Sequence, residues 1–313
     1  MTDNDLALKA HLLRRAGFGA SRSELEEISK KDYEDIVEDL LHPERFEDLD
    51  EDYVKRYNPE LSYHDTHPLH AGKWIWRMIN TKRPLEEKMA LFWHHIFPTA
   101  YYKSEHPPTL ITQIATFRKN GLSNLHQILL DLAKDPAMNY WLDNCENHSD
   151  QPNENWGREL LELFSMGVGN YTEEDIKNAA RAFTGWTFEQ PVPLYPNGQY
   201  ESSFVYDEND HDDSEKTFLG RTGRFNGEDI VNIICEERAT AKFICRHFFT
   251  FFVEDEPQVH TWSIEEPRNP KAIDSMVDVL MDNKGEIRPL LRFIFNSDFF
   301  KDARYKKVKN PTE

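Results

Sequence analysis

The chain has 313 residues, and its 56 acidic side chains against 37 basic ones give it a formal net charge of −19. A surface with this much negative charge repels phosphates and anionic lipid headgroups, which argues against nucleic-acid and membrane partners. Because 39% of the residues are hydrophobic and 12% are aromatic, the chain can build a sizeable core, which excludes global disorder.

The cysteines and the N-terminus indicate the compartment. Only three cysteines occur, far apart and without a Cys-x-x-Cys pair, so we expect neither a disulfide framework nor a thiolate zinc site. The first residues are polar and acidic, and no apolar run approaches the roughly 20 residues of a membrane span. We therefore expect a cytoplasmic protein without a signal peptide or a transmembrane segment.

Helical periodicity dominates the chain. It predicts two helices within 5–41, a long polar surface connection over 43–70, and two helices over 71–97 that break at Pro84, where proline suits the first turn. Further helices are expected at 108–120, 123–134, 137–142, 154–166, 173–186, 227–252, 269–283 and 286–296, with a polar loop at 143–153.

Residues 187–226 have a different character, because proline, glycine, aromatic and aspartate residues alternate there. This pattern predicts an irregular insertion with a small hairpin. The fold class is therefore mainly α: a single multi-helix globular domain over residues 1–313 with one long irregular insertion.

The helix expected at 154–166 has two contrasting faces. On a helical wheel, one arc carries Trp156, Leu160, Leu161, Leu163 and Phe164, and the opposite face carries Asn155, Arg158, Glu159 and Glu162. Two carboxylates, a guanidinium and an amide could bind a cation or position a polar substrate. The alternative is a solvated face with Glu–Arg pairs worth a few tenths of a kcal/mol, on the order of other helical pairs.

A second candidate cluster lies on the helix that starts at Pro84. Glu87 and His94 are seven residues apart and share one stripe, whereas His95 points about 100° away from His94. Imidazole and carboxylate together suit zinc, iron or manganese, or general acid–base work. The alternative is a core histidine beside aromatic neighbours.

The third candidate cluster lies in the irregular insertion, where His211, Asp212 and Asp213 precede Lys216. Irregular segments on a helical scaffold often carry functional side chains. An exposed acidic loop explains the same residues equally well.

Several strings together resemble a bacterial family known as domain of unknown function 1800. They are HLLRRAGFGAS (11–21), PLEEKMALFWHHIFPT (84–99), DPAMNYWLDN (135–144), PNENWGRELLELFSMGVGNYTEEDIKNAARAFTGW (152–186), HDDSEKTFLG (211–220) and VKNPTE (308–313). They span nearly the whole chain in the expected order. The family's biochemical activity is not established.

The resemblance implies that the three polar clusters converge on one site, because each coincides with a family motif. The implied catalytic residues are His94, Arg158, Glu159, His211 and Asp212, and the implied substrate-binding residues are Asn153, Glu154, Asn155 and Lys216. A metal at this site would be held by Glu87, His94, Glu159 and Glu162.

The sequence departs from the family pattern in two places. The family commonly has a second histidine two residues after the first, where this chain has Ile96, and this puts a two-histidine metal site in doubt. The motif at 308–313 is normally followed by a further helical region, so we expect either a truncated C-terminus or completion by another chain.

The leading functional hypothesis is an enzyme with a polar His/Glu/Arg site, and one version of it is assisted by a divalent metal. In it, His94 is a ligand or general base, Glu159 and Glu162 are carboxylate ligands or acids, and Arg158 is an anion clamp. One alternative is a haem-binding, peroxidase-like protein with His94 as the distal residue. The other is a non-enzymatic module that binds a partner from the family called domain of unknown function 1501, suggested by gene neighbourhood.

Overall fold

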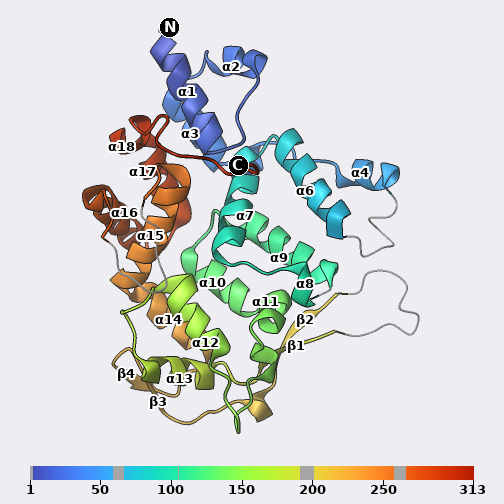
Figure 1. The fold of residues 1–313 in the computed structure, drawn as a ribbon, viewed down its shortest axis with the longest axis vertical. Helices are drawn as coiled ribbons and strands as arrows, with labels where there is room; N and C mark the ends of the chain where they lie inside the picture. Colours follow the sequence, from blue (N-terminus) through green and yellow to red (C-terminus); the bar gives the residue numbers. More distant parts are fainter. Residues whose placement is uncertain (1–2, 59–66, 105, 191–200, 257–265) are drawn as a thin grey trace.

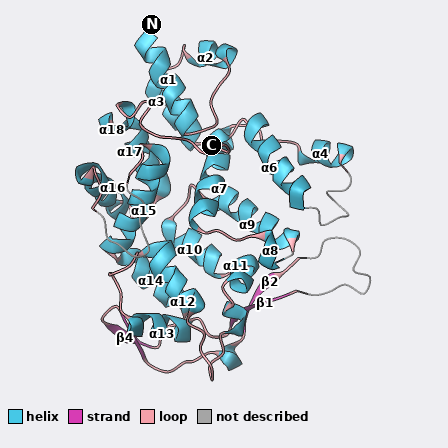
Figure 2. Ribbon diagram, in the orientation of Figure 1, coloured by secondary structure: helices cyan, strands magenta, loops and turns pink. Residues whose placement is uncertain are grey.

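The computed structural model describes residues 3–58, 67–104, 106–190, 201–256 and 266–313. Most of these residues are helical, and the strands in this part of the chain form two small two-stranded sheets (Figure 2). The predicted fold class, a mainly α single domain, is confirmed. Across the described ranges, none of the helices combines the length and the apolar character that crossing a bilayer requires.

The N-terminal helices form one end of the molecule (Figure 1). They are α1 (Asp3–Arg15), α2 (Arg22–Ile28), α3 (Tyr33–Leu41), a 3-10 turn over Pro43–Arg45, α4 (Glu51–Tyr57) and α6 (His67–Asn80). Ser21 caps α2 in a capping box with Glu24, which satisfies backbone N–H groups at the start of this short helix.

Two predictions in this region are wrong. Residues 5–41 hold three helices instead of two, because a polar break before Asp32 ends α2 and starts α3. The expected surface connection at 43–70 contains α4, whose first turn is capped by the Asp50 side chain. It also contains the start of α6, and its residues 59–66 lie outside the described residues.

The central helices follow the prediction closely. They are α7 (Pro84–Ile96), α8 (Tyr101–Ser104), α9 (Pro107–Asn120), α10 (Leu125–Ala133), α11 (Pro136–Trp141) and a 3-10 turn over Asn144–Glu146. Pro84 occupies the first turn of α7, as expected.

The helix expected at 154–166 changes its geometry half-way. It consists of α12 (Asn155–Glu159) and a π-helical segment (Leu160–Ser165), in which the Met166 N–H donates to the Leu161 carbonyl at 3.0 Å. A π turn holds more residues than an α turn, so later side chains drift out of phase. The Leu163 side chain is therefore 39% exposed. The helical wheel was wrong to place it on the buried apolar arc.

The irregular insertion is more regular than predicted, and it begins earlier, because α13 ends at Ala182 and not near Trp186. Helix α13 (Glu173–Ala182) is followed by β1 (Trp186–Glu189), β2 (Ser203–Tyr206), a 3-10 turn over Glu208–Asp210, β3 (Lys216–Phe218) and β4 (Arg221–Gly223). Strand β1 pairs antiparallel with β2, and β3 with β4, so two strand pairs replace the single hairpin. Residues 191–200 lie outside the described part.

The C-terminal helices pack along one side of the molecule (Figure 1). They are α14 (Gly227–Glu236), α15 (Arg238–Phe252), α16 (Pro270–Asp282), α17 (Ile287–Asn296) and α18 (Asp298–Lys301). The single helix expected at 227–252 is wrong, because Glu237 adopts an extended conformation that separates α14 from α15.

Aromatic side chains join the middle of the core. Phe92 of α7 lies 4.3 Å, between ring centroids, from Phe248 of α15, and Phe252 lies 5.6 Å from Phe295 of α17. All four rings are buried. Because aromatic residues bury a large apolar area, these contacts fix α7 against the C-terminal helices.

Gly185 allows the chain to turn from α13 into β1. Its φ is +78°, and a Cβ atom there would lie 2.4 Å from the Asp207 carbonyl oxygen. Gly220 has a similar φ of +76° but open space around its Cα. Left-handed backbone costs other residues roughly 1–2 kcal/mol, so this cost is common to both positions.

The two glycines provide a matched test of this turn. We expect Gly220→Ala to lower the free energy of unfolding by about 1 kcal/mol. Gly185→Ala should cost at least twice as much, because its methyl group also meets the backbone of residue 207. Urea denaturation measures both values, and equal losses would contradict the close approach.

Candidate functional site

The three predicted clusters lie in three separate places. His94 lines a pocket between α6, α7 and α9, whereas Arg158, Glu159 and Glu162 line a different groove beside α12 and α13. His211 and Asp212 lie in the turn before β3 and bond to the end of α13. The described structure therefore does not bring these residues together in one pocket.

The first of these hollows, which we call the His94 pocket, has a volume of about 330 Å³. Its walls are mainly apolar, from Ala71, Ala100, Pro107, Leu110, Ile111, Ile114 and Ala115. Its polar side is formed by Glu51, His70, Lys73, Trp74, Arg77, His94, Thr99, Tyr101 and Arg118. A mostly apolar cavity with a few convergent polar groups is typical of small-molecule sites.

A buried carboxylate holds the polar side of this pocket together. Glu87 is completely buried and accepts three hydrogen bonds: from Trp74 Nε1 at 2.9 Å, Arg77 Nε at 2.7 Å and Arg118 Nε at 2.6 Å. These donors come from α6 and α9, on either side of α7. A buried carboxylate is tolerated only when charge partners and hydrogen bonds satisfy it, as they do here.

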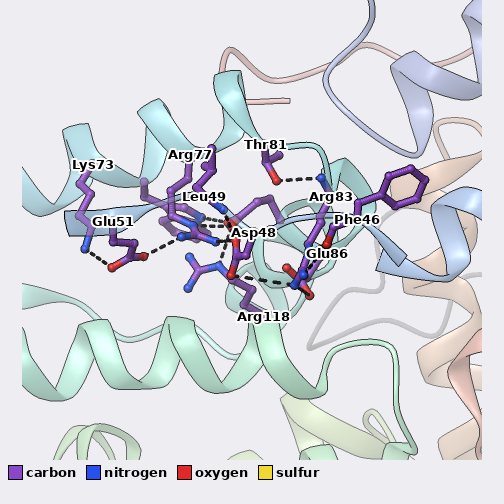
Figure 3. Close-up of polar contacts among 12 residues, drawn as sticks. Phe46, Asp48, Leu49, Glu51, Lys73, Arg77, Thr81, Arg83, Glu86 and Arg118 are labelled. Carbon is purple, nitrogen blue, oxygen red and sulfur yellow. Dashed lines mark hydrogen bonds and ion pairs between the residues drawn. The ribbon is translucent and has the colours of Figure 1, made fainter. Parts of the chain in front are cut away.

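Further acids complete the network around Arg77 (Figure 3). Its Nη1 and Nη2 donate to Glu51 at 2.6 Å and to Asp48 at 2.9 Å, so all three kinds of guanidinium nitrogen are engaged. For Arg118, by contrast, the hydrogen bonds among the described residues use only Nε. Its two terminal nitrogens therefore leave donor capacity on the wall of the pocket.

His94 meets the same network through Trp74. The two rings are 5.7 Å apart in an edge-to-face arrangement, and His94 Nδ1 is buried without a hydrogen-bond partner in the described part of the chain. Burial lowers the pKa of His94, and the neighbouring His95 lowers it further. The imidazole is therefore neutral at neutral pH and can accept a proton.

The second hollow, the Glu159 groove, has a volume of about 580 Å³ and is lined by Arg158, Glu159, Glu162, Leu163, Val168, Gly169, Tyr171 and Glu173. Arg158 Nη2 bonds to Glu173 at 2.8 Å and to Glu154 at 3.2 Å, and all three side chains are solvent-accessible. The Arg158 pair with Glu154 is the solvated helical pair that the sequence offered as the alternative. Burial raises the pKa of Glu159, and Glu162 raises it further.

The asparagines offered as substrate-binding residues are occupied by backbone contacts. Asn153 Nδ2 donates to the Asp143 carbonyl at 3.3 Å, and Asn155 Nδ2 donates to the Leu142 carbonyl at 3.0 Å. The Asn153 N–H in turn donates to the buried Asn147 side chain at 2.8 Å. These amides hold the 143–153 loop in place, a role that leaves little capacity for a substrate.

The third cluster is also held by hydrogen bonds within the protein, which involve His211, Asp212 and Lys216. Burial alone would raise the pKa of Asp212, but hydrogen bonds from Ser214 and from Arg181 Nε, the latter at 2.7 Å, hold it well below its usual range. His211 Nδ1 contacts the Thr184 carbonyl at 3.0 Å, and the buried Lys216 donates to backbone carbonyls of the same turn.

The predicted metal centre is not assembled. In the described ranges, no group of three His, Cys, Asp or Glu side chains is placed to hold a metal ion. Glu87 is occupied by arginines, His94 lies in its own pocket, and Glu159 and Glu162 line the groove. The described residues therefore do not bring the proposed ligand set together, because His94 lines one hollow, Glu159 and Glu162 line another, and Glu87 lines neither.

Residues 11–313 match the family described as "Protein of unknown function (DUF1800)". The chain belongs to this family. No curated protein and no solved structure matches the chain. The description of the family names no activity.

Three of the DUF1800 strings meet near the start of α7. The string at 11–21 contributes Arg15 and Phe18, the string at 84–99 contributes Lys88, and the string at 308–313 contributes Lys309 and Glu313. The C-terminal end of the chain accordingly lies beside α7 in Figure 1. The strings at 84–99 and 152–186 also supply residues to the His94 pocket and to the Glu159 groove, whereas the string at 211–220 forms the turn before β3 and that strand.

Sequence reasoning missed three partners of the His94 pocket in this DUF1800 member: Trp74, Arg77 and Arg118. A signal for Arg118 was present, because Leu110, Ile114 and Arg118 repeat every four residues along one face of α9. An arginine at the end of an apolar helical stripe predicts an acidic partner inside the protein. On α6, Trp74 and Arg77 lie three residues apart on one face, so an apolar side chain is again followed by an arginine there.

The Glu87 network gives the first prediction about the site. Glu87→Gln places an amide NH₂ group among donors that need an acceptor, so we expect a loss of about 3 kcal/mol in the free energy of unfolding. Glu154→Gln weakens only the accessible pair with Arg158 and should cost less than about 1 kcal/mol. Urea denaturation measures both variants, and equal losses would contradict the network's structural role.

Proposed function

We propose that this chain is an enzyme that binds a small organic anion with an apolar body in the His94 pocket. The observation that carries the proposal is that the His94 imidazole and the unused donors of Arg118 line the same apolar cavity. The guanidinium would bind a carboxylate or similar anionic group, and the walls from α9 would cover the apolar part.

In this proposal His94 is the general base. A neutral imidazole can take a proton from a bound substrate, and a pKa held low by burial keeps it ready at neutral pH. Glu87 is a positioning residue, because it does not line the pocket and instead holds Trp74, Arg77 and Arg118 by hydrogen bonds. The site keeps the predicted His/Glu/Arg composition but uses Glu87 and Arg118 in place of Glu159 and Arg158.

The proposal replaces the metal-assisted version, whose ligands lie in different hollows. The haem-binding alternative and the alternative of a partner from the domain of unknown function 1501 family stay predictions, because no observed contact bears on them. A cytoplasmic location also stays a prediction.

Ligand binding tests the pocket directly. Benzoate, phenylacetate and hexanoate should bind, as measured by saturation-transfer NMR and calorimetry. Their neutral amides should bind about tenfold more weakly, because a charge-assisted hydrogen bond to Arg118 is roughly twice as strong as a neutral one. Equal affinity of acids and amides would contradict an anion site.

A pair of variants on α9 separates the pocket from the rest of the surface. Ala115 is exposed and lines the pocket, so Ala115→Trp should block binding of benzoate without loss of stability. Thr112 is exposed on the same helix but does not line the pocket, and Thr112→Trp should leave binding unchanged. His94→Asn should retain binding but remove turnover of any substrate found.

The protonation of His94 can be measured without a substrate. In a ¹H–¹³C NMR titration, His94 should lose its proton at a pH below the ordinary 6.5, and His95→Gln should move that midpoint upward. Because the folded pKa is lowered, stability from the neutral imidazole is present above pH 6.5 and is lost as pH falls through the folded pKa.

His148 serves as the internal reference for this titration. Its pKa is raised by the hydrogen bond to Asp210, so it should titrate above 6.5 in the same spectra. A His94 midpoint at or above that of His148 would rule out a neutral base in the pocket.

A further inference from the structure

Lys88 is an amine buried in an aromatic setting. It lies on the inner face of α7 with Leu85, Met89 and Phe92, and no part of its side chain is exposed. Its Nζ lies 5.0 Å from the centroid of the Phe18 ring and 5.4 Å from that of Phe251. A lysine in such a place is rare unless it is paired.

The contacts of Lys88 do not satisfy an ammonium group. Within the described residues, its one hydrogen bond goes to the Glu313 carbonyl oxygen at 3.4 Å. Two other buried lysines are better served: Lys9 bonds to Asp5 at 3.0 Å and to the Ser29 carbonyl, and Lys216 bonds to two carbonyls. An ammonium has three donors, so the site suits a neutral amine with a free lone pair.

Positive charge surrounds this amine. Arg15 from α1 and Lys307 and Lys309 from the C-terminal segment all act on Lys88 electrostatically, with Glu313 as the one opposing acid. Asp255 pairs with Lys307 at 3.8 Å, and Arg14 lies at the rim, where its carbonyl accepts from Lys309. Burial, and then Lys309, lower the pKa of Lys88 to about 7.

We propose that Lys88 is a site of reversible carbamate formation with carbon dioxide. The Nζ lone pair attacks the carbon of CO₂ and forms an N–C bond, while one C=O π pair moves onto oxygen to give the carboxylate. The nitrogen then loses one proton to solvent, so the sum is R–NH₂ + CO₂ → R–NH–COO⁻ + H⁺. No electron transfer is involved, and CO₂ is the only co-reactant.

The surroundings suit the product better than they suit an ammonium. A carbamate turns the group from a cation or a neutral amine into an anion, among three cations and one acid. Its remaining N–H can keep the hydrogen bond to the main-chain oxygen of Glu313, and the rings of Phe18 and Phe251 give the small, apolar CO₂ molecule an apolar setting beside the amine. Lys88 does not line the His94 pocket and contacts Phe18 and the C-terminal segment instead, so the modification does not rest on the proposed function.

Carbon-13 NMR tests the proposal on the intact chain. In ¹³C-bicarbonate at pH 8 we expect a carbamate resonance that disappears in Lys88→Met, a variant that keeps the apolar packing. Lys9→Met, which removes a buried but paired lysine, should retain the resonance. A carbamate on the N-terminal amine would be common to all three proteins.

Trapping keeps the test independent of whether Lys88→Met folds. Triethyloxonium transfers an ethyl group to the carbamate oxygen and releases diethyl ether, so tryptic mapping of the treated, unaltered chain should find residue 88 uncut and carrying an ethoxycarbonyl group. An unmodified residue 88, or a resonance that persists unchanged in a folded Lys88→Met protein, would overturn the proposal.

Discussion

The carboxylate of Glu87 is the interaction on which the arrangement of this protein depends. It lies fully inside the molecule, and arginines from the helices on both sides of α7 neutralise it. An unpaired charge in such a position would cost several kcal/mol, roughly the whole stability of many domains. The fold therefore requires α6, α7 and α9 to stay together, and the His94 pocket exists because they do.

The polar residues of the family strings have two kinds of role. Asn153, Asn155 and Asp212 satisfy backbone groups and close turns, whereas His94 and Arg118 line a cavity. Buried backbone groups must find partners, and an irregular loop such as 143–153 finds them in side-chain amides. A family string can thus indicate a turn whose buried backbone groups need side-chain hydrogen bonds as readily as it indicates a catalytic site.

Much of the fold could be predicted from local patterns. The capping boxes at Ser21 and Thr172 and the proline at the start of α7 depend on neighbours within a few residues, and each is present. The break at Glu237 and the π-helical segment depend on tertiary packing, which no periodicity reports. The helices that carry such local signals were therefore predictable, whereas the breaks between α2 and α3 and between α14 and α15 were not.

The candidate site was harder to predict than the fold. His94, a candidate from the sequence, lines a pocket, but its neighbours there, Trp74 and Arg118, lie 20 and 24 positions away on other helices. Contacts at such separation depend on how helices pack. Lys88 was overlooked because a lysine in an apolar stripe is easily taken for a residue that reaches out to solvent.

The π-helical turn after α12 has a consequence for the history of this chain. Such a turn accommodates an additional residue inside a helix while the segments before and after keep their places. A relative with one residue fewer between Glu159 and Gly167 could thus form an ordinary α-helix here and still anchor Trp156 and Phe164 in the core. Length variation at this point would alter the rim of the Glu159 groove and leave the packing beneath it intact.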